Sequence, residues 1–300
     1  MNHSRRISLG VFLALAAMPV RAQPQRPLRV VASFSILADM VRNVGGDAID
    51  LSTLVGPDAD AHVFEPTPAD AKRLADADLV VVNGLGFEGW LVRLVRASGY
   101  KGPVAVASAG ITARRLGKEP DPHAWQDLTH ARRYVFNVRD ALTNARPAQA
   151  PGFEQRAAAY VERIAALDDE LRKTFDAIPK IQRRAITAHD AFGYLGAAYG
   201  IEFLAPQGMN TDSQPSAAAV ARLIDQIRKQ GVRAVFVENI SDPRLVERIA
   251  REGGAAVGGR LYSDALSPPG TAADTYLKLF AHNAAAIASG LTARSAVVKN

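Results

Sequence analysis

The sequence contains two series of short β-branched runs that alternate with amphipathic segments, and one long helical pattern separates them. The first series includes LRVVASF, IDLSTLV, DLVVVN and PVAVAS, and the second includes RAITAH, IEFLAP, VRAVFVEN and AAVGGRLY. Strands that alternate with helices form parallel sheets with helices on both faces. The sequence therefore predicts an α/β fold with two similar parallel-sheet lobes.

The pattern between the two series, PGFEQRAAAYVERIAALDDELRKTFDAIP, predicts a connector helix over residues 151–178. At about 1.5 Å per residue this helix would be about 40 Å long, the length of a domain. The chain exceeds what one hydrophobic core usually organises. We therefore expect a cleaved signal peptide over 1–22, a first lobe over 23–150, the rigid connector, and a second lobe over 179–300.

The first residues are typical of a secretory signal. Arg5 and Arg6 precede an apolar stretch, and Val20-Arg21-Ala22 is typical of a cleavage site. General secretion is expected, with twin-arginine export as the alternative. The sequence contains no cysteine, so we expect no lipid-modified cysteine and no disulfide. The expected location is the periplasm, as a soluble protein that is not a lipoprotein.

The charge balance argues against a nucleic-acid partner. Removing the three arginines of the signal peptide lowers the formal net charge from +6 to about +3. No block of basic residues is interleaved with aromatics, as is typical of nucleic-acid binding. No later apolar run is long enough to cross a bilayer.

Four residues stand in loop-like strings near the ends of predicted strands, where open α/β sheets place their ligands. The strings are DADAHVFEPTP, DPHAWQDL, ITAHDAFGYLG and LYSDALS. Taken singly, each residue is compatible with an ordinary loop or turn position. Together, three imidazoles and one carboxylate form a complete tetrahedral shell for a borderline divalent ion. The candidate ligands are His62, His123, His189 and Asp264.

Other residues near these positions have ordinary structural interpretations. His130 and His282 fall inside helical patterns, so we expect them to be structural. Glu65 and Glu238 are alternative ligands or hydrogen-bonding partners, the second role being favoured. Asp190 is a candidate N-cap for the helix that follows it.

The strings, read in order, give a resemblance over about residues 28–291. VVASFSILADMVRNVGGD, HVFEPTPAD, DLVVVNGLGFEGWL, DPHAWQDL, AHDAFGYLGAAYGI, GMNTDSQPS, VFVENI and LYSDALS resemble the metal-binding periplasmic receptors of ABC importers (cluster A-I). The resemblance implies that His62 and His123 bind a metal from the first lobe and His189 and Asp264 from the second, in the interlobe cleft. It also implies that the protein is a receptor and not an enzyme, and that it is a monomer. Such a receptor delivers its ion to an ABC permease, which works with an ATPase.

Two departures bear on the metal. Many zinc receptors carry a histidine-rich loop before the second ligand, whereas ITARRLGKEP contains no histidine. Manganese members commonly have a carboxylate at the third ligand position, whereas this chain has His189. Imidazole suits zinc better than manganese, so we expect Zn(II), with Mn(II) second and ferrous iron third. Protonation of the imidazoles near pH 5–6 is expected to weaken binding.

Three other classes of protein are weaker interpretations. A periplasmic zinc hydrolase would keep one metal position open for water, and the sequence has no H-E-x-x-H or G-x-S-x-G motif. Residues 84–89 formally match the dinucleotide fingerprint, but the next predicted strand does not end in an acidic residue. A binding module without metal requires that the four candidate ligands be dispensable.

Overall fold

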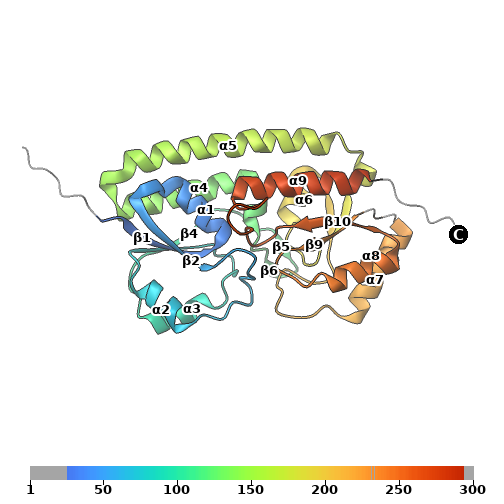
Figure 1. The fold of residues 1–300 in the computed structure, drawn as a ribbon, viewed down its shortest axis with the longest axis horizontal. Coiled ribbons are helices and arrows are strands. Elements are labelled where there is room, and N and C mark those ends of the chain that lie inside the picture. Colours follow the sequence, from blue (N-terminus) through green and yellow to red (C-terminus); the bar gives the residue numbers. More distant parts are fainter. Residues whose placement is uncertain (1–25, 231, 233, 294–300) are drawn as a thin grey trace, which may run out of the picture.

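The computed structural model describes residues 26–293 except 231 and 233, so the predicted signal peptide lies outside the described residues. Two lobes lie side by side beneath one long helix (Figure 1). The elements of the first lobe are β1 (Leu28–Phe34), α1 (Ser35–Gly45), β2 (Ile49–Val55), α2 (Pro68–Ala75), β3 (Leu79–Val82), α3 (Leu91–Ser98), β4 (Val104–Val106), β5 (Arg115–Leu116), β6 (Glu119–Pro120) and α4 (Leu128–Ala145). The remaining elements are α5 (Ala150–Asp176), β7 (Arg184–Ile186), α6 (Gly193–Tyr199), β8 (Glu202–Leu204), α7 (Ala217–Gln230), β9 (Ala234–Glu238), α8 (Arg244–Gly253), β10 (Ala256–Leu261) and α9 (Tyr276–Thr292).

Both main sheets have four parallel strands. Their orders are β2-β1-β3-β4 and β10-β9-β7-β8. If the strands are numbered from one to four along the chain within each lobe, both sheets have the order 2-1-3-4. The two lobes therefore repeat one topology, which confirms the predicted α/β fold with two similar lobes.

Helix α5 runs along one side of the molecule above both lobes (Figure 1). Its buried residues recur every three or four positions and include Phe153, Tyr160, Ile164 and Phe175, as expected for a helix that packs one face on a core. The helix ends at Asp176, two residues before the predicted end. One continuous helix thus connects the lobes.

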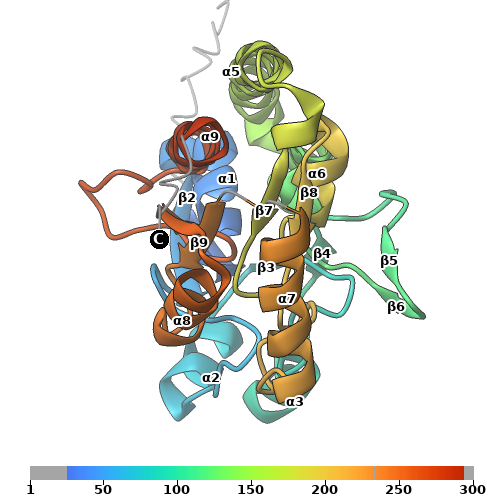
Figure 2. The ribbon, with the colours of Figure 1, turned by 90° about the vertical axis from the view of Figure 1, so that its right-hand side faces the viewer.

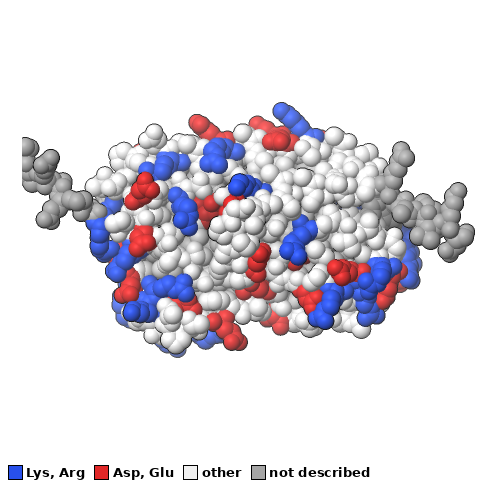
Figure 3. Space-filling view, in the orientation of Figure 1, with Lys and Arg blue, Asp and Glu red and all other residues white. Residues whose placement is uncertain are grey.

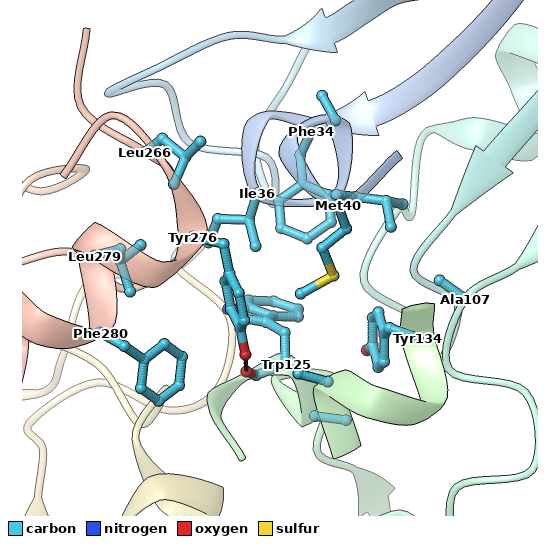
Figure 4. Packing of buried hydrophobic residues seen from close by; sticks show 14 of the residues in the cluster. Phe34, Ile36, Met40, Ala107, Trp125, Tyr134, Leu266, Tyr276, Leu279 and Phe280 are labelled. Atoms are coloured by element: carbon cyan, nitrogen blue, oxygen red, sulfur yellow. Dashed lines mark hydrogen bonds between the residues drawn. The ribbon is translucent and has the colours of Figure 1, made fainter. Parts of the chain in front are cut away.

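The seam between the lobes is filled by large apolar side chains (Figure 4). Trp125 of the first lobe is fully buried and lies 5.0 Å, centroid to centroid, from Phe34. Tyr276, at the start of α9, is also fully buried and donates its hydroxyl hydrogen bond to the carbonyl of Trp125. Such close packing resists the sliding of one lobe over the other.

Two short elements were not predicted. Helix α3 follows Trp90, and strands β5 and β6 pair antiparallel in a hairpin that projects from the body of the molecule (Figure 2). The hairpin lies within the histidine-free segment ITARRLGKEP. No helix within the described residues is long and apolar enough to cross a membrane.

Acidic and basic side chains are interspersed on the face shown in Figure 3. Several exposed arginines of the molecule are paired with acids, such as Arg248 with Glu252. A mixed surface of this kind lacks the single-sign field that steers nucleic acids to a protein.

Candidate metal centre

The structure brings the four predicted ligands together at the seam between the lobes. One donor atom from each of His62, His123, His189 and Asp264 lies within 4.8 Å of the others. The Nε2 atoms of His62 and His189 both lie 3.1 Å from Asp264 Oδ2, and His123 Nε2 lies 3.4 Å from His62 Nε2. Donors around a tetrahedral zinc, with bonds of about 2.0–2.1 Å, are separated by about 3.3 Å. These three separations are close to the edges of one tetrahedral shell.

His62 reaches the seam from the loop between β2 and α2. The loop ends where Thr67 caps α2 and Pro68 occupies the first helical position, a combination that fixes a helix start. The Trp90 indole donates a 2.8 Å hydrogen bond to the carbonyl of Ala61, just before His62. Phe87 packs edge-on against the His62 ring, with centroids 4.8 Å apart.

His123 lies between the β5–β6 hairpin and a short 3-10 turn that leads into α4. Its Nδ1 lies 2.8 Å from Asp121 Oδ1, which also accepts its backbone amide at 3.0 Å. The Asn83 amide group donates to the carbonyl of Pro122 at 2.9 Å. Asp121 therefore orients the ring so that Nε2 faces the other candidate ligands, as carboxylates do for metal-binding histidines.

His189 lies three residues beyond the end of β7, where it forms an isolated bridge with Gln207. Its Nδ1 lies 2.7 Å from Glu238 Oε2, at the end of β9. Glu238 Oε1 accepts the backbone amides of Ala188 and His189 at 2.7 and 3.0 Å. Both side chains are fully buried. Glu238 thus has the hydrogen-bonding role that the sequence favoured for it.

Asp264 follows β10, and side chains of the first lobe hold the residue before it. The side chains of Trp125 and Gln126 donate to the carbonyl of Ser263 at 3.1 and 2.7 Å. Asp264 is fully buried, and its Oδ1 has no hydrogen-bond partner among the described residues. An unsatisfied buried carboxylate oxygen is costly, and a metal ion would satisfy it.

The ionisation of the cluster depends on its own charges. Burial disfavours the charged form of His123, but Asp264 and Asp121 outweigh burial and raise the pKa of His123 to about 9. Burial also lowers the pKa of His189, but the charges of Glu238 and Asp264 outweigh burial and raise this pKa well above its ordinary value. Burial opposes ionisation of Asp264, but His189 and His123 hold its pKa well below the usual range. A metal ion must therefore displace protons at neutral pH.

The comparison with known proteins identifies the family. The family described as "Zinc-uptake complex component A periplasmic" matches residues 30–290. The chain belongs to this family of metal-binding receptors of ABC importers.

Relatives in the family are named for different metals. The chain is 34% identical over 270 residues to the iron-binding protein YfeA of Yersinia pestis, covering 88% of this chain and 86% of that one. It is 32% identical over 267 residues to the manganese-binding lipoprotein MntA of Halalkalibacterium halodurans, covering 88% and 89%. Among solved structures, the periplasmic zinc-binding protein TroA of Treponema pallidum superposes with a TM-score of 0.85 at 32% identity, covering 89% and 100%.

The other residues considered from the sequence are not members of the candidate metal cluster. His130 packs edge-on against Tyr194, and His282 Nε2 lies 3.0 Å from the carbonyl of Arg260. Glu65 is exposed and belongs to no candidate metal group among the described residues. Asp190 is not a helix cap, because α6 begins at Gly193.

Sequence reasoning missed Trp125 and Gln126 as supports of Asp264, because 138 and 137 positions separate them from Ser263. The available signal was the string DPHAWQDL, in which a bulky indole and an amide directly follow His123. Both side chains are fully buried, which makes their hydrogen bonds to the second lobe specific rather than incidental.

Proposed function

We propose that this protein captures Zn(II) in the periplasm and delivers it to an ABC permease, whose ATPase drives import. The convergence of three imidazoles and one carboxylate from both lobes, all within 4.8 Å, carries this proposal. The ion is cargo. It binds the four candidate ligands, the loaded receptor docks on the permease, and the ion is released without chemical change. The receptor acts as a monomer.

The choice of zinc rests on the donor set. Three nitrogen donors and one oxygen donor suit zinc better than manganese, which favours oxygen-rich sites. The separations of 3.1–3.4 Å between donors support a small tetrahedral shell. Because relatives are named for manganese, iron and zinc, Mn(II) is the second candidate and Fe(II) the third.

A receptor without turnover fits the site better than a hydrolase. A catalytic zinc has three protein ligands and one open position for water, whereas four protein donors close the shell. A dinucleotide enzyme is also disfavoured, because the buried Glu88 carboxylate already accepts the backbone amides of Asn83 and Gly84 at 2.6 and 3.1 Å. Those amides are not available to a pyrophosphate.

We propose that the exported protein is free in the periplasm. MntA is named as a lipoprotein, but the 300 residues of this chain contain no cysteine to which a lipid could be attached. Cell fractionation tests this. A membrane-bound fraction that resists salt would contradict it.

The decisive experiment is a direct competition between Zn(II) and Mn(II) for residues 23–300 stripped of metal. We expect one zinc per chain that excess manganese does not displace, and weaker binding in the His189→Ala and Asp264→Ala variants. His282→Ala is the matched control, because among the described residues its ring contacts the carbonyl of Arg260 and the ring of Tyr262, which lie outside the cluster. Manganese retained against zinc would assign a manganese importer, and binding unaffected by either substitution would disprove the site.

A further inference from the structure

His62 is held differently from the other two candidate imidazole ligands. The Nδ1 atoms of His123 and His189 each contact a buried carboxylate. No carboxylate contacts Nδ1 of His62 within the described part of the chain. Instead, Asp60 Oδ1 accepts the His62 backbone amide at 2.9 Å. The position of His62 therefore depends on the backbone of its loop, which Asp60 braces.

The second oxygen of the same carboxylate reaches the other lobe. Thr211 donates its hydroxyl hydrogen bond to Asp60 Oδ2 at 2.5 Å. Thr211 lies between β8 and α7, in a segment that runs beside His189: Gln207 forms a bridge with His189, and the carbonyl of Gly208 accepts the amide of Asp190 at 3.1 Å. One carboxylate thus connects the His62 loop with the segment beside His189.

This connection forms part of the wall of a cavity of about 600 Å³. Asp60 and Thr211 line the cavity together with Ala188, the residue before His189. The side chain of His62 is 3% exposed, whereas those of the other three ligands are fully buried. An ion that leaves the cluster needs an opening, and loosening the bond between Asp60 and Thr211 would provide one on the side of the cavity.

We propose that Asp60 is a positioning residue for His62, and that its hydrogen bond with Thr211 is a clasp that slows release of the bound divalent ion. This inference rests on the proposed function of the four-ligand site. Loss of this hydrogen bond should not unfold the protein, because other hydrogen bonds hold the same loop. Asn239 donates to Asp58 Oδ1 at 2.9 Å, and the Asp58 amide donates to the carbonyl of Leu266 at 2.9 Å.

Thr211→Val tests the clasp, because it removes the hydroxyl and keeps the shape of the side chain. The control is Thr174→Val, which removes a hydroxyl bonded to a carbonyl on the exposed face of α5. Zinc-loaded protein is mixed with excess chelator and the dissociation rate is measured, together with thermal unfolding of the metal-free protein. We expect Thr211→Val to release zinc about tenfold faster, the usual effect of losing a hydrogen bond to a charged group. Thr211→Ser should restore the slow rate, and metal-free unfolding should match that of the control.

The Asp60→Ala background tests whether the two residues act together. Adding Thr211→Val to Asp60→Ala should not change the dissociation rate further. A rate for Thr211→Val equal to that of Thr174→Val would overturn the clasp, as would independent effects of the two substitutions. If His189→Ala also leaves zinc binding intact, the proposed metal site itself fails. If His189→Ala weakens binding while Thr211→Val changes nothing, only the clasp is wrong.

Discussion

The two lobes share one strand order but supply their candidate ligands from different places. Both His123 and Asp264 come after the fourth strand of a main sheet. Asp264 closely follows β10, whereas the β5–β6 hairpin separates His123 from β4. His62 follows the second strand of the first lobe, whereas His189 follows the first strand of the second lobe. The repeated topology brings the loops to one seam, but the metal chemistry does not repeat with it.

The lobes also differ in how firmly they hold the ligands. The second lobe provides two fully buried ligands, one supported by Glu238 and the other by the fixed carbonyl of Ser263. The first lobe provides His123, whose ring Asp121 orients, and His62, which is positioned by its loop and by the Phe87 ring without a carboxylate at Nδ1 among the described residues. We infer that His189, Asp264 and His123 keep their positions when the metal is absent, and that His62 is the ligand that completes the site.

The largest expected effect comes from removing the charge that all three imidazoles share. Asp264→Ala should weaken zinc binding by about a thousandfold, because breaking a buried charge cluster costs about 3–5 kcal/mol. His62→Ala should weaken it less, by about a hundredfold, because the buried charge of Asp264 remains beside His123 and His189. Chelator competition measures both affinities. An equal or larger loss in His62→Ala would contradict the asymmetry between the lobes.

The carboxylates behind the imidazoles allow a matched comparison between the lobes. Glu238→Gln and Asp121→Asn each keep an oxygen that accepts the backbone amides but remove the charge beside a histidine Nδ1. Each should weaken zinc binding by about 10–100-fold, as second-layer carboxylates of metal sites do. The same competition assay applies. A loss confined to one variant would show that only one lobe depends on this support.

The pH dependence of binding should extend above the range near pH 5–6 expected from ordinary imidazoles. The raised pKa of His123, about 9, means that the metal-free protein holds a proton there which zinc must displace. Affinity should therefore increase as pH rises towards 9, by about tenfold per unit for each proton released. Isothermal titration in buffers of different ionisation enthalpy counts the protons. Affinity that is constant between pH 7 and 9 would contradict it.

The raised pKa of His123 should make the metal-free protein less stable as pH rises, although zinc affinity increases over the same range. Because the folded pKa of His123 is raised, its stabilising effect is complete below about pH 6.5 and is lost as pH rises through 9. Asp264, whose pKa is lowered, stabilises the fold above about pH 4 and loses that effect only as pH falls through its lower folded pKa. Unfolding of the metal-free chain at pH 6 and pH 9 should show the decrease. His123→Ala should make it smaller but leave a part, because the pKa of His189 is raised as well.

Local sequence patterns predicted most of the secondary structure and all four candidate ligands. Thr67 and Pro68 marked the start of α2 because capping depends on neighbouring residues alone. Asp190 failed as a cap for a tertiary reason. Its amide donates to the carbonyl of Gly208, and the chain bends there before α6 begins at Gly193. A bond to a distant segment leaves no local signal.

The hydrogen bonds that hold the candidate ligands in place could not be predicted for the same reason. His62, His123 and His189 could be found because imidazoles are few and stood in irregular strings. The bond from Gln126 to Ser263 joins positions 137 apart, and the bond from Thr211 to Asp60 joins positions 151 apart. Neither pairing follows from residue type or spacing. They depend on how the two lobes pack at the seam.

The smallest expected effect concerns that packing. Tyr276→Phe removes the hydrogen bond from α9 to the carbonyl of Trp125, and Tyr100→Phe removes a similar bond to the carbonyl of Pro103 inside the first lobe. Each should lower stability by about 1 kcal/mol, which is about 2 °C in thermal unfolding. Only Tyr276→Phe should also weaken zinc binding, by a fewfold, because Trp125 connects the seam to Asp264. Equal zinc affinities in the two variants would show that the lobes hold their ligands independently of the seam.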